Sequence, residues 1–195
     1  MNNQTERQQE IVYATLTLID EKGIQGMTIR NLSVQLGISE SAIYRHFEDK
    51  THILLALCDL VKNNSNEIFE SELNSCQPAI GKIEHLFERH FSSFSDMPSL
   101  ASVVFSEEMF RNEKKLTEKV SGIIISNIKI MQTILKEAQL DKEIRNDISA
   151  DHLSIILMGT LRLFIKYWHF SGFSYNLREE GHKLTREIKL LITKR

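Results

Sequence analysis

The sequence has little proline, cysteine or glycine: two, two and eight residues in a chain of 195. So few helix-breaking residues leave room for long stretches of helical periodicity, and this composition predicts an all-α protein. The two cysteines, Cys58 and Cys76, lack the spacing of a metal site, and a reducing cytoplasm is the simplest setting for them. We therefore expect no metal ion and no other cofactor.

Long apolar runs are also missing. No stretch of about 18 apolar residues occurs, so no transmembrane helix is expected. The first ten residues, MNNQTERQQE, lack the basic and then apolar form of a secretory signal. The sequence predicts a cytoplasmic protein with no membrane partner.

Motifs that carry catalysis are absent too. The chain has no Gly-rich phosphate loop, no nucleophile elbow and no metal-ligand helix signature. Its seven histidines are scattered along the sequence. We expect that the protein is not an enzyme and has no catalytic residue.

The segment 28–50 is strongly patterned, and it is cut once, by Gly37. Glycine suits the residue that follows a helix, because it enters the left-handed region at no steric cost. Thr28 and Ser39 are good N-caps for helices on either side of the cut. Each helix has an apolar face, formed by Ile29, Leu32 and Leu36 in the first and by Ile43 and Phe47 in the second. Two short helices joined by a tight turn describe a helix-turn-helix, although an ordinary helical hairpin in a core has the same pattern.

The run from Arg7 to Leu57 resembles the DNA-binding domain of the TetR family, the tetracycline-repressor-like bacterial regulators. The matching motifs are TIRNL at 28–32, LGIS at 36–39 and IYRHFEDK at 43–50. The periodic pattern itself predicts about nine helices, the first over about 5–22 and the pair over Thr28–Leu36 and Ser39–Phe47, with Asp49 as the N-cap of a fourth. The resemblance implies a three-helix helix-turn-helix DNA-binding domain over residues 1–50. A long fourth helix, at about 50–70, would join it to a ligand-binding and dimerisation domain over residues 51–195. It also implies a double-stranded DNA operator as partner and a bacterial, nucleoid-associated location.

In such motifs the second helix enters the major groove and presents base-reading and phosphate-binding side chains. The guanidinium of Arg45 can donate two hydrogen bonds to guanine. Glu40 either accepts a hydrogen bond from a cytosine amino group or only stabilises its helix through the helix dipole. Tyr44 either contacts phosphate or covers the edge of the core. The net charge of this segment does not by itself support DNA binding, since residues 1–55 carry five basic and seven acidic side chains. The predicted DNA-binding residues are Thr28, Ser39, Glu40, Ser41, Tyr44, Arg45, His46 and Lys50.

The last two predicted helices, about 149–171 and 176–193, carry a dimerisation pattern. Apolar and small residues recur there at spacings of three and four, which is typical of a coiled-coil stripe. An intramolecular core would produce the same pattern. The predicted homodimer interface consists of Ile156, Gly159, Leu163, Trp168, Leu177, Gly181, Leu184, Ile188 and Leu191.

The middle helices are rich in aromatic residues and methionine, as ligand pockets often are. By the resemblance, a small-molecule effector binds there and repositions the DNA-binding domains. An apolar stripe also forms an ordinary core, and the sequence leaves both possibilities open. The predicted pocket residues are Phe87, His90, Phe91, Phe94, Phe105, Met109, Met131, Met158, Arg162 and Phe164.

These features together predict a sequence-specific transcriptional regulator, a repressor that an unknown and largely apolar ligand releases from its operator. The alternative is an architectural or protein-tethering DNA-binding protein without a small-molecule ligand. Loss of operator binding on addition of a ligand separates the two.

Overall fold

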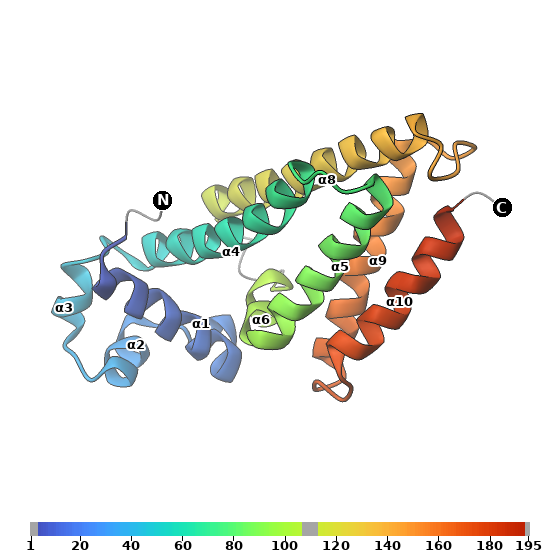
Figure 1. Cartoon of the computed structure of the whole chain (residues 1–195). Helices are drawn as coiled ribbons and strands as arrows, with labels where there is room; N and C mark the ends of the chain where they lie inside the picture. The colour runs from blue at the N-terminus through green and yellow to red at the C-terminus, as the bar shows by residue number, and fades with distance from the viewer. Residues whose placement is uncertain (1–3, 107–112, 194–195) are drawn as a thin grey trace. The chain divides into compact units, whose positions relative to one another are not determined.

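The computed structural model describes residues 4–106 and 113–193, and within these ranges the chain forms nine α-helices and no β-strand. The all-α prediction is therefore confirmed. Helix labels follow Figure 1. The helices are α1 (Glu6–Gly26), α2 (Ile29–Leu36), α3 (Glu40–Tyr44), α4 (Lys50–Leu73), α5 (Ala79–Asp96), α6 (Ser99–Val104), α8 (Lys114–Leu140), α9 (Ala150–Phe170) and α10 (Leu177–Ile192).

Two helix ends differ from the sequence-based prediction. The first helix was expected to end near Lys22, and Gly23 does leave the helical region there, with φ at +66°, but one more turn follows to Gly26. The third helix ends at Tyr44 and not at Phe47. The amides of His46 and Phe47 both donate to the carbonyl of Ile43, so the chain leaves α3 through a tight turn.

The chain divides into two compact units. Unit 1 comprises Met1–Asn63 and Ser99–Ser121, and unit 2 comprises Asn64–Pro98 and Gly122–Arg195. Two long helices, α4 and α8, contribute residues to both units. The domain boundary expected at residue 50 coincides with the first residue of α4 and lies inside unit 1.

Unit 1 is organised around α1, which packs against α2 and α6, while α2 packs against α3 (Figure 1). Apolar side chains from these helices and from the start of α4 are fully buried between them. The most deeply buried are Ile11, Leu18, Met27, Leu32, Ile43, Ile53 and Leu57. This core holds the two short helices of the helix-turn-helix from behind.

Unit 2 is built on α5, which packs against both α9 and α10 (Figure 1). Buried aromatic rings from three of its helices form its centre, among them Phe69, Phe87 and Phe91. Its polar contacts include a half-buried ion pair, in which Lys82 Nζ lies 3.2 Å from Glu137 Oε2 and 3.3 Å from the carbonyl of Leu73. These contacts fix the end of α4 against α5 and α8.

Candidate DNA-binding interface and effector site

The turn between α2 and α3 has the geometry that the sequence predicts. Gly37 adopts φ +65° and ψ +31°, which is the left-handed conformation that a side chain disfavours. Its amide donates to the carbonyl of Val34 at 3.2 Å, and the next amide, of Ile38, donates to the carbonyl of Ser33 at 3.0 Å. These two bonds end α2 and reverse the chain within three residues.

The expected N-caps at the start of α2, α3 and α4 are confirmed. Thr28 Oγ1 accepts from the amide of Asn31 at 3.1 Å, and Ser39 Oγ accepts from the amide of Ala42 at 3.2 Å. Asp49 Oδ1 accepts from the amide of His52 at 2.9 Å, and this bond holds the pKa of the Asp49 carboxyl below its usual value. Each cap satisfies a backbone amide that has no partner within its own helix.

One face of α3 is buried and the opposite face is open. Ile43 is fully buried and Phe47 nearly so, and these two side chains hold the helix on the core of unit 1. Glu40, Ser41 and Tyr44 are exposed on the other side, with Arg45 directly after the helix. An exposed N-terminal half on a rigid support is the arrangement that a recognition helix needs to approach base edges.

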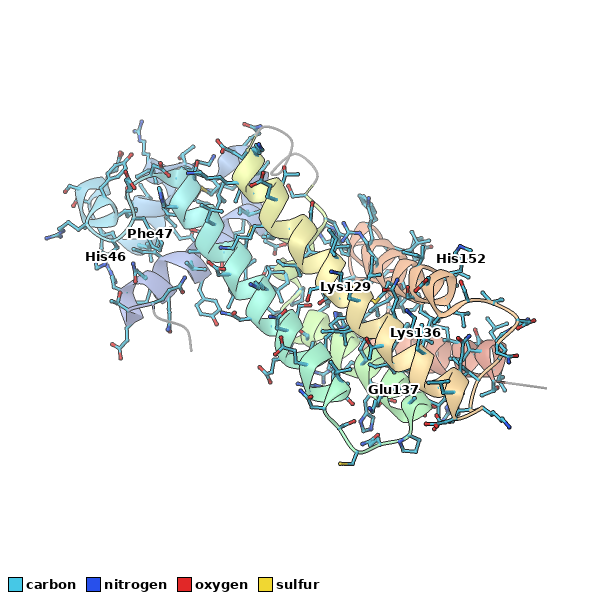
Figure 2. All side chains as sticks on the ribbon, turned by 90° about the horizontal axis from the view of Figure 1, so that it is seen from above. His46, Phe47, Lys129, Lys136, Glu137 and His152 are labelled. Carbon is cyan, nitrogen blue, oxygen red and sulfur yellow. The ribbon has the colours of Figure 1, made fainter. Side chains whose placement is uncertain are left out.

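Gln8 is a supporting residue that sequence reasoning missed. Its side-chain amide donates to the carbonyl of His46 at 3.1 Å, while its Oε1 accepts from the amide of Thr5 at 2.9 Å. Figure 2 shows His46 beside Phe47 at the end of this turn. Gln8 thus ties the start of α1 to the end of the recognition helix. The capping pattern of Thr5 and Gln8 was the available signal, although it does not reveal the distant partner.

The remaining predicted DNA contacts differ in exposure. Thr28 and Ser39 are exposed but use their oxygens in the caps, whereas His46 and Lys50 are half-buried at the α3–α4 junction. The side chains of Glu48 and Asp49 lie near His52, at 3.5 Å and 3.0 Å, and add negative charge beside Lys50. All eight predicted residues therefore lie between Thr28 and Lys50 of unit 1, and none of them is fully buried.

Four of the predicted effector residues are buried in unit 2, and a fifth, Phe164, is half-buried and contacts one of them. The rings of Phe87, Phe91 and Phe164 form a chain of edge contacts, with centroids 6.0 Å and 5.5 Å apart. His90 is buried with its ring edge-on to Phe69, and the two centroids lie 5.2 Å apart. Met131, on α8, is fully buried as well.

The other predicted effector residues are placed differently. Phe94 and Met158 are half-buried, and Arg162 is exposed on α9. Phe105 follows α6 and belongs to unit 1, so it does not lie in the interior of unit 2. Met109 is outside the described residues.

The predicted dimer residues separate into two groups. Trp168, Leu177, Gly181 and Ile188 are buried within unit 2, which corrects their assignment to a partner-facing surface. A Cβ atom on Gly181 would lie only 2.3 Å from Phe91 Cδ2, so this glycine permits close packing inside the subunit. Helical spacing alone does not distinguish an inner stripe from an outer one.

The second group is accessible. Ile156, Gly159, Leu163 and Leu191 are exposed, and Leu184 is half-buried. Ile155 is exposed beside Ile156, and three further large exposed side chains on the same helices were not predicted, Tyr167, Phe170 and Leu190. These residues form an apolar stripe along the surface of α9, with further apolar residues at the end of α10.

The comparisons with known proteins agree with this architecture. The family description "Bacterial regulatory proteins, tetR family" matches residues 11–57, and "YsiA-like protein, C-terminal region" matches residues 60–193. The chain therefore belongs to the TetR family. It is a sequence-specific DNA-binding transcriptional regulator, as its helix-turn-helix predicts.

Individual relatives are distant but cover nearly the whole chain. The fatty acid metabolism regulator protein of Bacillus subtilis is 23% identical over 177 residues, which is 91% of both chains. The nucleoid occlusion factor SlmA of Photobacterium profundum is 20% identical over 179 residues, again 91% of both. The structure of the transcriptional regulator FadR from Bacillus subtilis in complex with stearoyl-CoA superposes with a TM-score of 0.79 and 22% identity, covering 92% of this chain and 96% of that one.

In the described part of the chain, no helix is both long and apolar enough to cross a membrane, and no cluster of three potential metal ligands occurs.

Proposed function

We propose that this TetR-family regulator is a homodimeric repressor that leaves its operator when a long-chain acyl-CoA binds in the interior of unit 2. The observation that carries the DNA-binding part is the open face of α3 on a fully buried support. The ligand class is supported by two relatives, a fatty acid metabolism regulator and a structure with stearoyl-CoA bound. The largely apolar interior of unit 2 suits an acyl chain.

In this proposal the residues of α3 divide into readers and anchors. Arg45 donates two hydrogen bonds to guanine, and Ser41 allows the helix to approach the base edges closely. Tyr44 and Lys50 bind phosphate and set the register of unit 1 on the duplex. Glu40 either accepts from a cytosine amino group or acts only on the helix dipole, and substitution by glutamine separates these roles.

The proposed dimer uses the apolar stripe on α9. Ile155, Ile156, Leu163, Tyr167 and Phe170 are each more than half exposed, and Phe170 reaches 73%. A contiguous exposed apolar surface of this kind marks an interaction site, and a two-fold interface buries the same surface on both copies. A dimer then presents two recognition helices to two half-sites about one turn of DNA, or a multiple of a turn, apart.

Release of the operator follows from differential binding. The acyl-CoA must bind the conformation of low operator affinity more tightly than the conformation that binds the operator. Equal affinity for the two conformations would leave their populations unchanged. A coupling of about 1–3 kcal/mol lowers DNA affinity roughly 5- to 150-fold. We expect an effect in this range.

The test is fluorescence anisotropy with labelled DNA from upstream of the protein's own coding sequence, with random duplex in parallel and across a salt series. Tight and selective binding that stearoyl-CoA reverses, while free CoA does not, is the expected result. Selective binding that no acyl-CoA changes would refute the ligand class but leave the DNA-binding role intact. Binding no tighter than to random duplex, at every salt concentration, would contradict a self-regulating operator.

A second candidate function is an architectural role on DNA without a small ligand. The specific observation in its favour is the similarity, over 91% of the chain, to a protein named as a nucleoid occlusion factor. In that case DNA binding stays unchanged with every acyl-CoA tested. The same anisotropy experiment therefore distinguishes the two candidates.

A further inference from the structure

A buried amide oxygen in unit 2 has no hydrogen-bond partner. Among the described residues, two buried side-chain oxygens are unpaired, Glu72 Oε2 and Asn127 Oδ1. The Glu72 carboxylate has Arg89 at 3.7 Å and His85 at 3.8 Å, so nearby cations explain it. No charged partner of this kind accompanies Asn127, whose side chain is only 7% exposed on α8.

The other end of the Asn127 amide is fixed. Its Nδ2 donates to Ser65 Oγ on α4 at 2.7 Å, and Ser65 is buried as well. This bond orients the amide and leaves Oδ1 as an acceptor. An unpaired buried carbonyl is costly to stability, so its retention suggests a partner that is bound only some of the time.

A second acceptor belongs to His90 on α5, whose ring contacts Phe69 one helical turn beyond Ser65 on α4. Phe69 follows Ser65 by four residues, about 6 Å along the helix axis, and the ring of His90 packs edge-on against Phe69. His90 Nδ1 lies 3.3 Å from the carbonyl of Leu86, so Nδ1 carries the proton and Nε2 is an acceptor. Burial lowers the pKa of His90 to about 4, and the ring is neutral near pH 7. Within the described part of the chain, no hydrogen bond reaches Nε2.

The surroundings of these two acceptors contain polar groups that are already paired. Asn64 Nδ2 donates to Ser93 Oγ at 2.7 Å, and Ser93 lies one turn beyond His90 on α5. Met131, one turn beyond Asn127 on α8, is fully buried and apolar. The meeting point of α4, α5 and α8 therefore offers hydrogen-bond acceptors in an otherwise apolar interior.

We propose that Asn127 Oδ1 receives an O–H or N–H group of the effector, with His90 Nε2 as a further acceptor in the same unit, so that this site selects apolar chains that carry a neutral hydrogen-bond donor. The inference rests on the proposed effector site in unit 2 and adds the chemistry that this site recognises. Two sources supply such a donor. One is a hydroxyl group on the acyl chain, and the other is an amide N–H beside the thioester, in the pantetheine arm of CoA.

The test uses a matched pair of small probes that does not depend on CoA. The first is 1-octanol, and the second is its methyl ether, which has the same chain but no donor. We expect titration calorimetry on the intact protein to show that 1-octanol binds about 5- to 10-fold more tightly than the ether, the value of one buried hydrogen bond. Asn127→Leu should abolish this preference.

The controls separate recognition from packing. Ser65→Ala removes the partner of Nδ2 but keeps the acceptor, so the preference for 1-octanol should survive. The double variant Asn127→Leu with Ser65→Ala should unfold at a temperature no lower than the wild type, because it removes the unpaired oxygen and leaves no unpaired hydroxyl at position 65. If Asn127→Leu does not fold, Asn127→Ala, which also removes the acceptor oxygen, should lose the preference and serves in its place.

Each outcome has a defined meaning. Equal affinity of the wild-type protein for both probes, binding of neither, or a preference that persists in Asn127→Leu would overturn the proposal. A preference for the ether would also overturn it, because the ether has no donor. A 5- to 10-fold loss of stearoyl-CoA affinity in Asn127→Leu assigns the donor to the pantetheine arm. An unchanged stearoyl-CoA affinity, together with loss of the preference for 1-octanol, assigns the donor to a hydroxyl group on the acyl chain. If stearoyl-CoA does not bind the wild type but the octanol preference holds, only the proposed ligand class fails.

Discussion

The glycine at position 181 provides the sharpest test of the packing inside unit 2. A Cβ atom there would lie 2.3 Å from Cδ2 and 2.6 Å from Cγ of Phe91. Ordinary carbon contacts are about 3.5–4.0 Å long, so the ring must move by more than about 1 Å. Phe91 is almost completely buried and is held by edge contacts with Phe87 and Phe164. Gly181→Ala therefore forces a dense aromatic cluster apart.

The magnitude follows from two opposing effects. Overpacking a well-packed core lowers the free energy of unfolding by about 1–3 kcal/mol, whereas replacing glycine by alanine inside a helix raises it by up to about 1 kcal/mol. The 2.3 Å contact places Gly181→Ala at the upper end of the overpacking range, about 2–3 kcal/mol, so the net loss is about 1–2 kcal/mol. In a chain of this length, each kcal/mol lowers Tm by about 2–4 °C, so we expect a decrease of roughly 2–8 °C.

The assay is thermal unfolding at a fixed protein concentration, because association changes the apparent stability. Gly122→Ala is the matched control, since nothing lies within 4 Å of a Cβ atom at that exposed position on α8, outside the proposed dimer stripe. We expect the control to unfold no earlier than the wild type. A second substitution, Phe91→Leu, should make the loss from Gly181→Ala smaller than in the wild-type background.

A Gly181→Ala variant that is as stable as the wild type would refute this close packing of Gly181 on Phe91. A variant with unchanged monomer stability but weaker self-association would instead restore Gly181 to the dimer interface, as the sequence pattern had suggested. Sedimentation at several concentrations distinguishes these results.

The remaining predictions concern DNA, the dimer and pH. Arg45→Ala should weaken operator binding by about 1–3 kcal/mol and random duplex much less, whereas Lys50→Ala should weaken both alike; equal losses on both DNAs for Arg45→Ala would contradict base reading. Gln8→Ala should lower the ratio of operator to random affinity by about 2- to 10-fold, because one hydrogen bond that holds the end of α3 is lost, and an unchanged ratio in anisotropy would contradict this positioning role. Leu163→Glu, at a side chain that is 67% exposed, should leave monomer stability nearly unchanged but dissociate the dimer; light scattering that still gives a dimer would exclude this face. Burial lowers the pKa of His90 to about 4 in the folded protein, against about 6.5 in the unfolded chain. Between these two pH values the unfolded chain binds more protons, so the free energy of unfolding should fall by roughly 3 kcal/mol as the pH drops from about 6.5 to 4. Urea unfolding checks this against His90→Gln, which should lose most of that pH dependence.

The helix-turn-helix is the part of the molecule that local sequence describes best. The caps at Thr28, Ser39 and Asp49 and the left-handed turn at Gly37 all depend on residues within four positions of one another. Such short-range hydrogen bonds and backbone preferences are readable without knowledge of the fold. The division of α3 into a buried and an open side follows from the same helical periodicity.

Unit 2 is less accessible to the same reasoning. A stripe of apolar residues predicts that one face of a helix is covered, but not whether the cover is the same chain or a second copy. Trp168 and Leu177 proved to face the interior, while Leu163 and Tyr167 of the same region are exposed. This choice depends on how α9 and α10 rotate to pack on α5, and no local pattern records that rotation.

The sequence by itself determined the all-helical class, the caps and turn of the helix-turn-helix, and the membership of the TetR family, because each depends on composition or on neighbouring residues. Only the tertiary structure decided that Gly181 accommodates Phe91, that Gln8 holds the end of α3, and that Asn127 keeps an unpaired oxygen in the interior. These features join residues from 38 to 90 positions apart. Their free energies arise from contacts that exist only after the helices have packed.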